Sequence, residues 1–159
     1  MKFDEIDKKI LDILQINCNI TNAQLASEVG ISPSSMLERV KRLENSKIIK
    51  KYVALVSPEK VGRGTLAIVS VSLAMHRLES VDTLIKALNE LDEVLECFHT
   101  AGEEDFILKV AVKDIQEYQN FVLNKLSKIE GINKIKTTFV LSTVKYQTCF
   151  PIAKNGDEE

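Results

Sequence analysis

The chain has 159 residues, of which 45% are hydrophobic and 28% charged, and its formal net charge is −2. This balance is typical of a folded protein of one or two domains, so disorder is not the default interpretation. No apolar stretch approaches the roughly 20 residues that a membrane-spanning helix needs. The start, MKFDEIDKK, lacks the apolar core of a secretory signal, so we expect a cytoplasmic protein without a membrane segment.

The residue types that carry metal or nucleophilic chemistry are sparse. Cys18, Cys97 and Cys149 are odd in number and far apart, which favours reduced thiols over a disulfide framework. The two histidines and the scattered cysteines show no zinc-site spacing, and no glycine-rich phosphate loop or nucleophile–base pair is present. We therefore expect no metal site, no cofactor and no enzymatic activity.

Three amphipathic helices are predicted in the first half of the chain, over about 4–16, 22–29 and 33–46. Thr21 with Gln24 resembles a capping box, and Gly30 stands where a helix needs a left-handed C-terminal residue. Ser32 is a good N-cap and Pro33 suits the first helical position. Two helices joined by a tight turn with glycine, the second of them basic, are typical of a helix-turn-helix.

The third predicted helix has a basic neighbourhood. Residues 38–51 contain six Lys and Arg against two Glu, although the whole chain is slightly acidic. With Met36, Val40 and Leu43 on its buried side, the opposite side is polar and suits a DNA groove. The candidate DNA-binding residues are Ser32, Ser34, Ser35, Glu38, Arg39, Lys41, Arg42, Lys50 and Lys51. A three-helix packing module with a solvated outer face is the alternative.

Within this candidate surface we expect two roles. Ser34, Ser35 and Glu38, near the start of the helix, are expected to approach base edges. The basic side chains Arg39, Lys41 and Arg42 are expected to hold phosphates. The DNA-binding domain is predicted to span 1–52 and to be winged-helix-like. A strand is predicted within 48–56, and the breakers after it predict a hinge, so 53–64 is assigned as a strand and hinge linker.

From Thr65 the apolar residues recur at the period of a strand. The pattern predicts strands from Thr65, over 94–100, 106–112 and 135–146, with a helix capped by Ser80 after the first and another, ending at Gly131, after the third. This is a ferredoxin-like βαββαβ sandwich over 65–151, followed by a frayed tail at 152–159. The fold class is therefore α+β.

One face of such a sheet cannot be covered by its own helices. The outer positions are mixed rather than charged: Ser70, Ser72, Thr138, Val140 and Val144. A self-associating surface would bury them, so we expect a two-fold dimer. Dimerisation also presents two recognition helices to successive major grooves of double-stranded DNA.

Three stretches together resemble the Lrp/AsnC (leucine-responsive, or feast/famine) regulator family, and the similarity runs over about 4–151. They are DKKILDILQ at 7–15, ISP at 31–33 with RVKRLE at 39–44, and GEEDF at 102–106. The resemblance implies a sequence-specific transcription regulator whose dimers assemble into a ring, commonly an octamer, and bind an amino acid between them. Ala101, where many relatives have a hydroxyl residue, and Glu38, where many have a basic one, depart from the family pattern.

The resemblance implies an effector site around Gly102 and Asp105. The candidate effector-binding residues are His99, Thr100, Ala101, Gly102, Glu103, Glu104, Asp105 and Phe106. A glycine permits close approach of a ligand, and a carboxylate can accept from an α-ammonium group. A plain exposed turn and a structural His99 are the alternatives here. Two alternative functions remain for the whole chain: a metabolite-binding oligomer that uses its helices for protein contacts, and a small enzyme on this scaffold.

Overall fold

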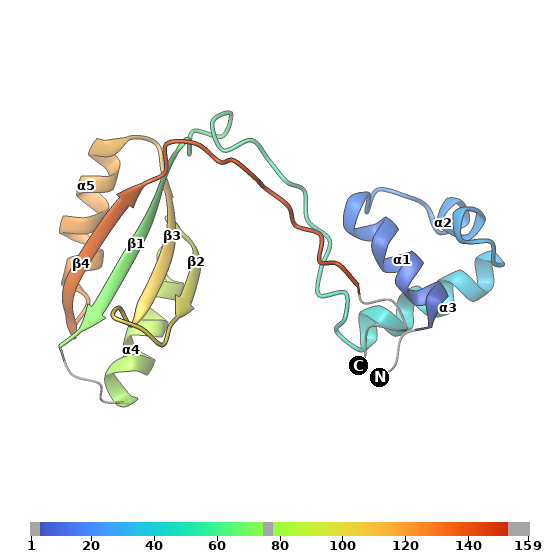
Figure 1. The fold of residues 1–159 in the computed structure, drawn as a ribbon, viewed down its shortest axis with the longest axis horizontal. Coiled ribbons are helices and arrows are strands. Elements are labelled where there is room, and N and C mark those ends of the chain that lie inside the picture. Colours follow the sequence, from blue (N-terminus) through green and yellow to red (C-terminus); the bar gives the residue numbers. More distant parts are fainter. Residues whose placement is uncertain (1–3, 75–77, 153–159) are drawn as a thin grey trace. The chain divides into compact units, whose positions relative to one another are not determined.

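The computed structural model describes residues 4–74 and 78–152. Within the second range, residues 78–81 are described by their backbone alone. The chain divides into two compact units: unit 1 comprises Met1–Ala54 with Lys145–Glu159, and unit 2 comprises Leu55–Val144. Figure 1 labels the elements of both units. From residue 153 on, the predicted tail lies outside the described residues. No helix in the described part of the chain is long and apolar enough to cross a membrane.

Unit 1 is built from three helices, α1 (Glu5–Ile16), α2 (Asn22–Val29) and α3 (Pro33–Asn45). Thr21 and Gln24 cap each other's backbone at the start of α2, and Gly30 ends α2 with a φ of 83°. Pro33 opens α3, where its missing N–H leaves no bond unmade. The three predicted helices are therefore confirmed, with ends that differ by a residue at most.

The core of unit 1 joins all three helices. Its most deeply buried side chains, each no more than 1% exposed, are Ile10, Leu25, Ala26, Met36 and Leu43. Because Met36 and Leu43 point inward, the polar side of α3 is turned to the surface, as the helical spacing predicts.

The segment 145–152, called the C-terminal segment below, packs with unit 1. The Gln15 side chain on α1 donates through Nε2 to the carbonyl of Phe150 at 3.1 Å and accepts the Phe150 N–H at 2.7 Å. Ile152 packs against the helical core. The sequence prediction placed residues up to 151 in the second domain, whereas these contacts assign 145–152 to the helical unit.

The predicted strand within 48–56 is not formed. No residue of this stretch is in a strand, and the side chains of 50–57 are all exposed. A strand is stabilised by hydrogen bonds to a neighbour, and no described strand pairs with this stretch. The apolar residues therefore indicate an extended backbone without a partner, and the described part of unit 1 contains no strand that would form a wing.

Unit 2 has the predicted βαββαβ order. Its elements are β1 (Thr65–Leu73), α4 (Leu78–Asn89), β2 (Val94–His99), β3 (Phe106–Val112), α5 (Ile115–Asn124), a 3₁₀ turn (Leu126–Lys128) and β4 (Ile132–Phe139). The strands form one antiparallel sheet in the order β2-β3-β1-β4, shown in Figure 1. Inward side chains of β1 and β3 pack with Leu84 and Leu88 of α4 and with Phe121 of α5. The ferredoxin-like sandwich is confirmed.

Three predicted boundaries in unit 2 differ from the structure. Helix α4 begins at Leu78, so Ser80 lies inside its first turn instead of preceding it. Helix α5 ends at Asn124 and a 3₁₀ turn follows, although Gly131 does adopt a left-handed φ of 92°. Strand β4 spans Ile132–Phe139 instead of 135–146. It ends where its partner does, because Phe139 pairs with Ala67 near the start of β1.

Among the described elements of unit 2, none covers the face of the sheet opposite the helices. Ser70 pairs with Ile107 on β3 and with Lys136 on β4, so these three side chains share that face. Val144, predicted to belong to it, lies beyond β4 and is 97% exposed. The outer face is thus a mixture of apolar, hydroxyl and charged side chains, and the charged ones include Lys136 and the Lys109–Glu96 ion pair. The prediction of a face that is mixed rather than charged is therefore wrong as to charge.

Candidate nucleic-acid interface and ligand loop

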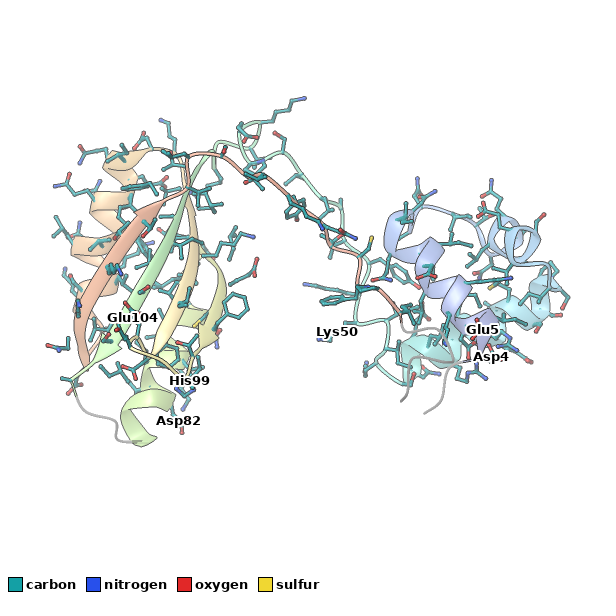
Figure 2. The ribbon with its side chains drawn as sticks, in the orientation of Figure 1. Asp4, Glu5, Lys50, Asp82, His99 and Glu104 are labelled. Carbon is teal, nitrogen blue, oxygen red and sulfur yellow. The ribbon has the colours of Figure 1, made fainter. Side chains whose placement is uncertain are left out.

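The candidate DNA-binding residues all lie in unit 1, on α3 or close to its ends. The exposed ones are Ser32, Ser34, Glu38, Lys41, Arg42, Lys50 and Lys51, while Ser35 and Arg39 are half-buried. Ser32 is the N-cap of α3: its Oγ accepts the N–H of Ser35 at 3.2 Å and lies 3.1 Å from the Ser34 hydroxyl. Lys50, labelled in Figure 2, follows α3 in a segment without regular secondary structure.

Two arginines of α3 bind aspartates of α1, and these four residues form what we call the Asp7 cluster: Asp4, Asp7, Arg39 and Arg42. Arg39 donates through Nη1 to Asp4 at 2.7 Å and to Asp7 at 2.9 Å. Arg42 donates through Nη2 to both carboxylate oxygens of Asp7, at 2.7 and 2.6 Å. The Asp7 side chain is only 3% exposed, and a buried carboxylate needs such partners.

The bonds within the Asp7 cluster shift the pKa values of Asp4 and Arg39. Hydrogen bonds from the Asp7 backbone N–H and from Arg39 lower the pKa of Asp4. The same pairing with Asp4 raises the pKa of Arg39. Figure 2 labels Asp4 at the start of α1. Arg39 and Arg42, which the sequence suggested as phosphate ligands, thus fasten α3 to α1.

Glu38 and Lys41 are exposed side chains of α3 that lie outside the Asp7 cluster. Among the described residues, neither Glu38 nor Lys41 has a side-chain hydrogen bond or ion pair within the chain. Leu37 is 41% exposed beside them and was missed from the sequence. The available signal was its position, since it falls outside the Met36, Val40 and Leu43 stripe.

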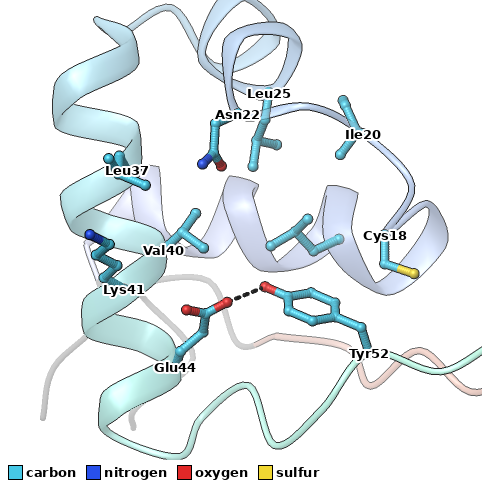
Figure 3. A pocket seen from close by; sticks show the side chains of 10 residues that line it. Cys18, Ile20, Asn22, Leu25, Leu37, Val40, Lys41, Glu44 and Tyr52 are labelled. Atoms are coloured by element: carbon cyan, nitrogen blue, oxygen red, sulfur yellow. Dashed lines mark hydrogen bonds between the residues drawn. The ribbon is translucent and has the colours of Figure 1, made fainter.

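A pocket of about 210 Å³ opens between the three helices and the segment after α3 (Figure 3). Its wall includes Leu25, Leu37 and Lys41. Tyr52 closes one side by donating its hydroxyl hydrogen to Glu44 Oε1 at 2.9 Å, drawn as the dashed line in Figure 3. Burial and the neighbouring carboxylate raise the pKa of Tyr52 to about 12. Tyr52 therefore ties the segment after α3 to that helix.

In unit 2 the candidate effector residues form the turn between β2 and β3. Thr100 N–H donates to the Asp105 carbonyl at 2.9 Å, and its hydroxyl donates to the Glu104 carbonyl at 2.7 Å. Asp105 N–H donates to the Val71 carbonyl at 3.0 Å, while Asp105 Oδ2 accepts the N–H of Leu73 at 2.8 Å. Asp105 thus fastens the turn to the end of β1.

The middle of this turn is open to solvent. Ala101, Gly102 and Glu103 are exposed. A Cβ added to Gly102 would meet no atom within 4 Å, and Gly102 does not adopt a positive φ. Within the part of the chain that the structure describes, nothing therefore requires a glycine at this position.

His99 and Phe106 flank the turn, and Figure 2 labels His99 and Glu104 there. The His99 ring stacks on Phe106, with centroids 4.7 Å apart and an angle of 15° between planes. Phe106 itself is buried. Glu104 lies 3.8 Å from Lys136 Nζ on β4. His99 therefore has a packing contact here, although by stacking instead of by the hydrogen bond expected of a structural histidine.

Metal-ligating and thiol groups are dispersed. Within the described residues, no group of three or more His, Cys, Asp or Glu could hold a metal ion. Cys18 and Cys97 are exposed and Cys149 is half-buried, all three as free thiols. Partial burial raises the pKa of Cys97, which makes its thiol a weaker nucleophile at neutral pH.

Known proteins match both units of the chain. Residues 3–50 match a family model described as winged helix-turn-helix DNA-binding, and residues 66–149 match one described as Lrp/AsnC ligand binding domain. A leucine-responsive regulatory protein of Haemophilus influenzae is 38% identical over 151 residues, 95% of this chain and 90% of that protein. The transcriptional regulator AzlB of Bacillus subtilis is 34% identical over 149 residues, 94% and 95% of the two chains.

A solved structure shares the fold over nearly the whole chain. A transcriptional regulator of Neisseria meningitidis, crystallised in complex with L-Met, has a TM-score of 0.90 and 35% identity, covering 94% of this chain and 97% of that one. Together with the outward polar side of α3, these matches define a helix-turn-helix DNA-binding protein with a separate ligand-binding domain. The chain belongs to the Lrp/AsnC family, and it is a DNA-binding transcription regulator of that type.

Proposed function

We propose that this regulator reads double-stranded DNA with the exposed side of α3 and changes its DNA affinity when an amino acid binds the turn 99–106. One observation supports the DNA surface above others: Glu38 and Lys41 point outward from α3 without partners, while the Asp7 cluster fixes the helix to α1. A helix held in this way can enter a major groove without rearrangement. Lys41, Lys50 and Lys51 supply the cations for the phosphates.

The effector site is proposed at the open part of the turn. Gly102 leaves room for a ligand to approach the backbone, and the exposed Glu103 offers a carboxylate to an α-ammonium group. The L-Met complex of the Neisseria meningitidis relative supports an amino acid as the class of ligand. Asp105 contributes mainly by holding the turn to β1.

The oligomer is proposed to be a dimer formed through the outer face of the sheet, and an octamer of four dimers. Ile68 and Ile107 are half-buried on that face within a single chain, and a second copy would remove them from water. The effector turn would then lie between neighbouring dimers. We also propose that the protein acts in the cytoplasm, where its DNA is.

The experiment is a salt-dependent DNA-binding assay with the full-length protein and duplexes from the region upstream of its own gene, with and without each amino acid. The proposal expects affinity to fall steeply with salt and one or a few amino acids to change it. Linkage then requires DNA to change the affinity for that amino acid by the same factor. Absence of salt-sensitive binding to any duplex would refute the DNA surface, and unchanged affinity with every amino acid would refute the effector.

A further inference from the structure

The arrangement of α3 limits which side chains can read bases. Reading a guanine with arginine takes two parallel N–H donors from one guanidinium. Arg42 directs Nη2 at both oxygens of Asp7, and Arg39 directs Nη1 at Asp4 and Asp7. Each arginine therefore has one terminal nitrogen engaged with an aspartate of α1. Exposed residues of α3 outside the Asp7 cluster have no such bonds to give up when they meet a base, and Glu38 and Leu37 are two of them.

Glu38 is an unusual group to present to DNA. Its carboxylate is exposed and repelled by phosphates, so it weakens binding to every sequence unless a base donates to it. In the major groove, the exocyclic N4 amino group of cytosine is the donor that carboxylates accept from. Lys41 lies one turn further along α3 and offsets part of the repulsion.

Leu37 is the apolar counterpart of Glu38. It is 41% exposed, whereas the other apolar side chains of α3, Met36, Val40 and Leu43, are buried. The apolar group that base edges present in the major groove is the C5 methyl of thymine. Adjacent helical residues differ by about 1.5 Å in rise. Base pairs are about 3.4 Å apart, so the rise keeps Leu37 and Glu38 within reach of neighbouring base pairs, although the two side chains leave the helix about 100° apart.

We propose that Glu38 and Leu37 determine the sequence preference of this regulator. Glu38 accepts a hydrogen bond from N4 of a cytosine, and Leu37 contacts the methyl group of a thymine within two base pairs of it. Lys41 contacts phosphate and adds affinity without preference. This inference rests on the proposed DNA function of α3.

The first test is selection of binding sites from a random duplex library with the full-length protein. The inference expects each half-site to contain a C·G and a T·A pair within two base pairs of each other. Glu38→Ala should abolish a preference of about tenfold for the C·G pair over its replacements. Lys41→Ala is the matched control, and it should weaken binding to all sequences alike.

The second test changes the DNA and leaves the protein intact. Replacing the selected thymine by uracil removes one methyl group and should lower the affinity of the wild-type protein about fourfold. The same replacement should leave the affinity of Leu37→Ala unchanged. Leu37→Met keeps an apolar side chain, so its affinity should still fall when uracil replaces thymine. Circular dichroism establishes that each variant is folded.

The outcomes separate this inference from the proposed function. If no duplex is bound, α3 is not a DNA surface and the proposed function fails. If binding is salt-sensitive but Glu38→Ala keeps the cytosine preference, or Leu37→Ala keeps the loss on uracil substitution, the DNA function stands and the assignment of these two residues is overturned.

Discussion

Arg42 on α3 places one guanidinium nitrogen 2.7 and 2.6 Å from the two carboxylate oxygens of Asp7, a side chain that is 3% exposed on α1. Arg39 donates to the same carboxylate. The buried charge is thus compensated from the helix that we propose to read DNA. The orientation of α3 and the stability of unit 1 therefore depend on the same contacts.

The contacts of the Asp7 cluster lead us to predict a loss of stability when a carboxylate of α1 is removed. Asp7→Ala should lower the free energy of unfolding by about 2–3 kcal/mol, because charged hydrogen bonds to Arg39 and Arg42 are lost. Arg42→Ala should cost about 1 kcal/mol, since Arg42 is 46% exposed and Asp7 keeps Arg39. Urea unfolding followed by circular dichroism measures both. Asp12→Ala, an exposed carboxylate on the same helix, is the control, and an equal loss there would contradict a specific role for Asp7.

From the raised pKa of Tyr52 we predict that the protein loses stability at high pH. Its folded-state pKa of about 12 is above its ordinary value of 10.0, so the folded state holds the proton more tightly than the unfolded chain. The stabilisation is complete below the unfolded pKa and is lost as the pH rises through 10 toward 12. As the pH rises through this range, the unfolding free energy of the wild type should therefore fall relative to that of Tyr52→Phe. A pH-independent difference would exclude the contribution of this hydroxyl.

We predict that loss of the Gln15 side chain opens the C-terminal segment locally. Gln15→Ala removes both hydrogen bonds to the Phe150 backbone, which together stabilise the segment by about 1 kcal/mol or more. Hydrogen exchange at the Phe150 amide should become faster, while exchange in β1 and β3 stays unchanged. Asn120→Ala on the exposed side of α5 is the matched control. Unaltered protection of Phe150 would mean that the segment is held without Gln15.

Two carboxylates of the effector turn should separate ligand binding from stability. Asp105→Ala removes the acceptor of the Leu73 N–H and should destabilise the protein by about 2 kcal/mol without any ligand. Glu103→Ala is exposed and should leave stability unchanged while weakening the binding of the amino acid. Thermal unfolding and calorimetric titration with the amino acid measure the two effects. A destabilised Glu103→Ala with full ligand affinity would reverse the assigned roles.

The regular elements followed from local signals in the sequence. Capping at Thr21 and Gly30, and the period of the apolar residues after Thr65, predicted the helices of unit 1 and the βαββαβ order. The stretch 48–56 was misjudged because the alternation that suggests a strand does not show whether a partner strand exists. The position of the C-terminal segment was missed for a similar reason, since it depends on Gln15, more than 100 residues away along the chain.

The candidate DNA surface was predicted in outline, and individual roles depended on contacts that spacing does not reveal. Arg39 and Arg42 lie where the helical spacing puts them, but the buried Asp7 binds both, and that pairing spans more than 30 residues. Leu37 was omitted because an apolar residue on a flank resembles core. In the effector turn, Asp105 was predicted as a carboxylate that accepts from the α-ammonium group of a ligand, whereas its bond to the Leu73 N–H could be seen only in the fold.

The salt dependence of DNA binding by Lys41→Ala tests the central claim most directly. If the exposed side of α3 meets DNA, loss of this phosphate contact should reduce the slope of log affinity against log salt by about one for each protomer bound. Lys86→Ala, an equal charge change on α4 in unit 2, should leave the slope unchanged. An unchanged slope for Lys41→Ala, or an equal reduction for both variants, would contradict the account.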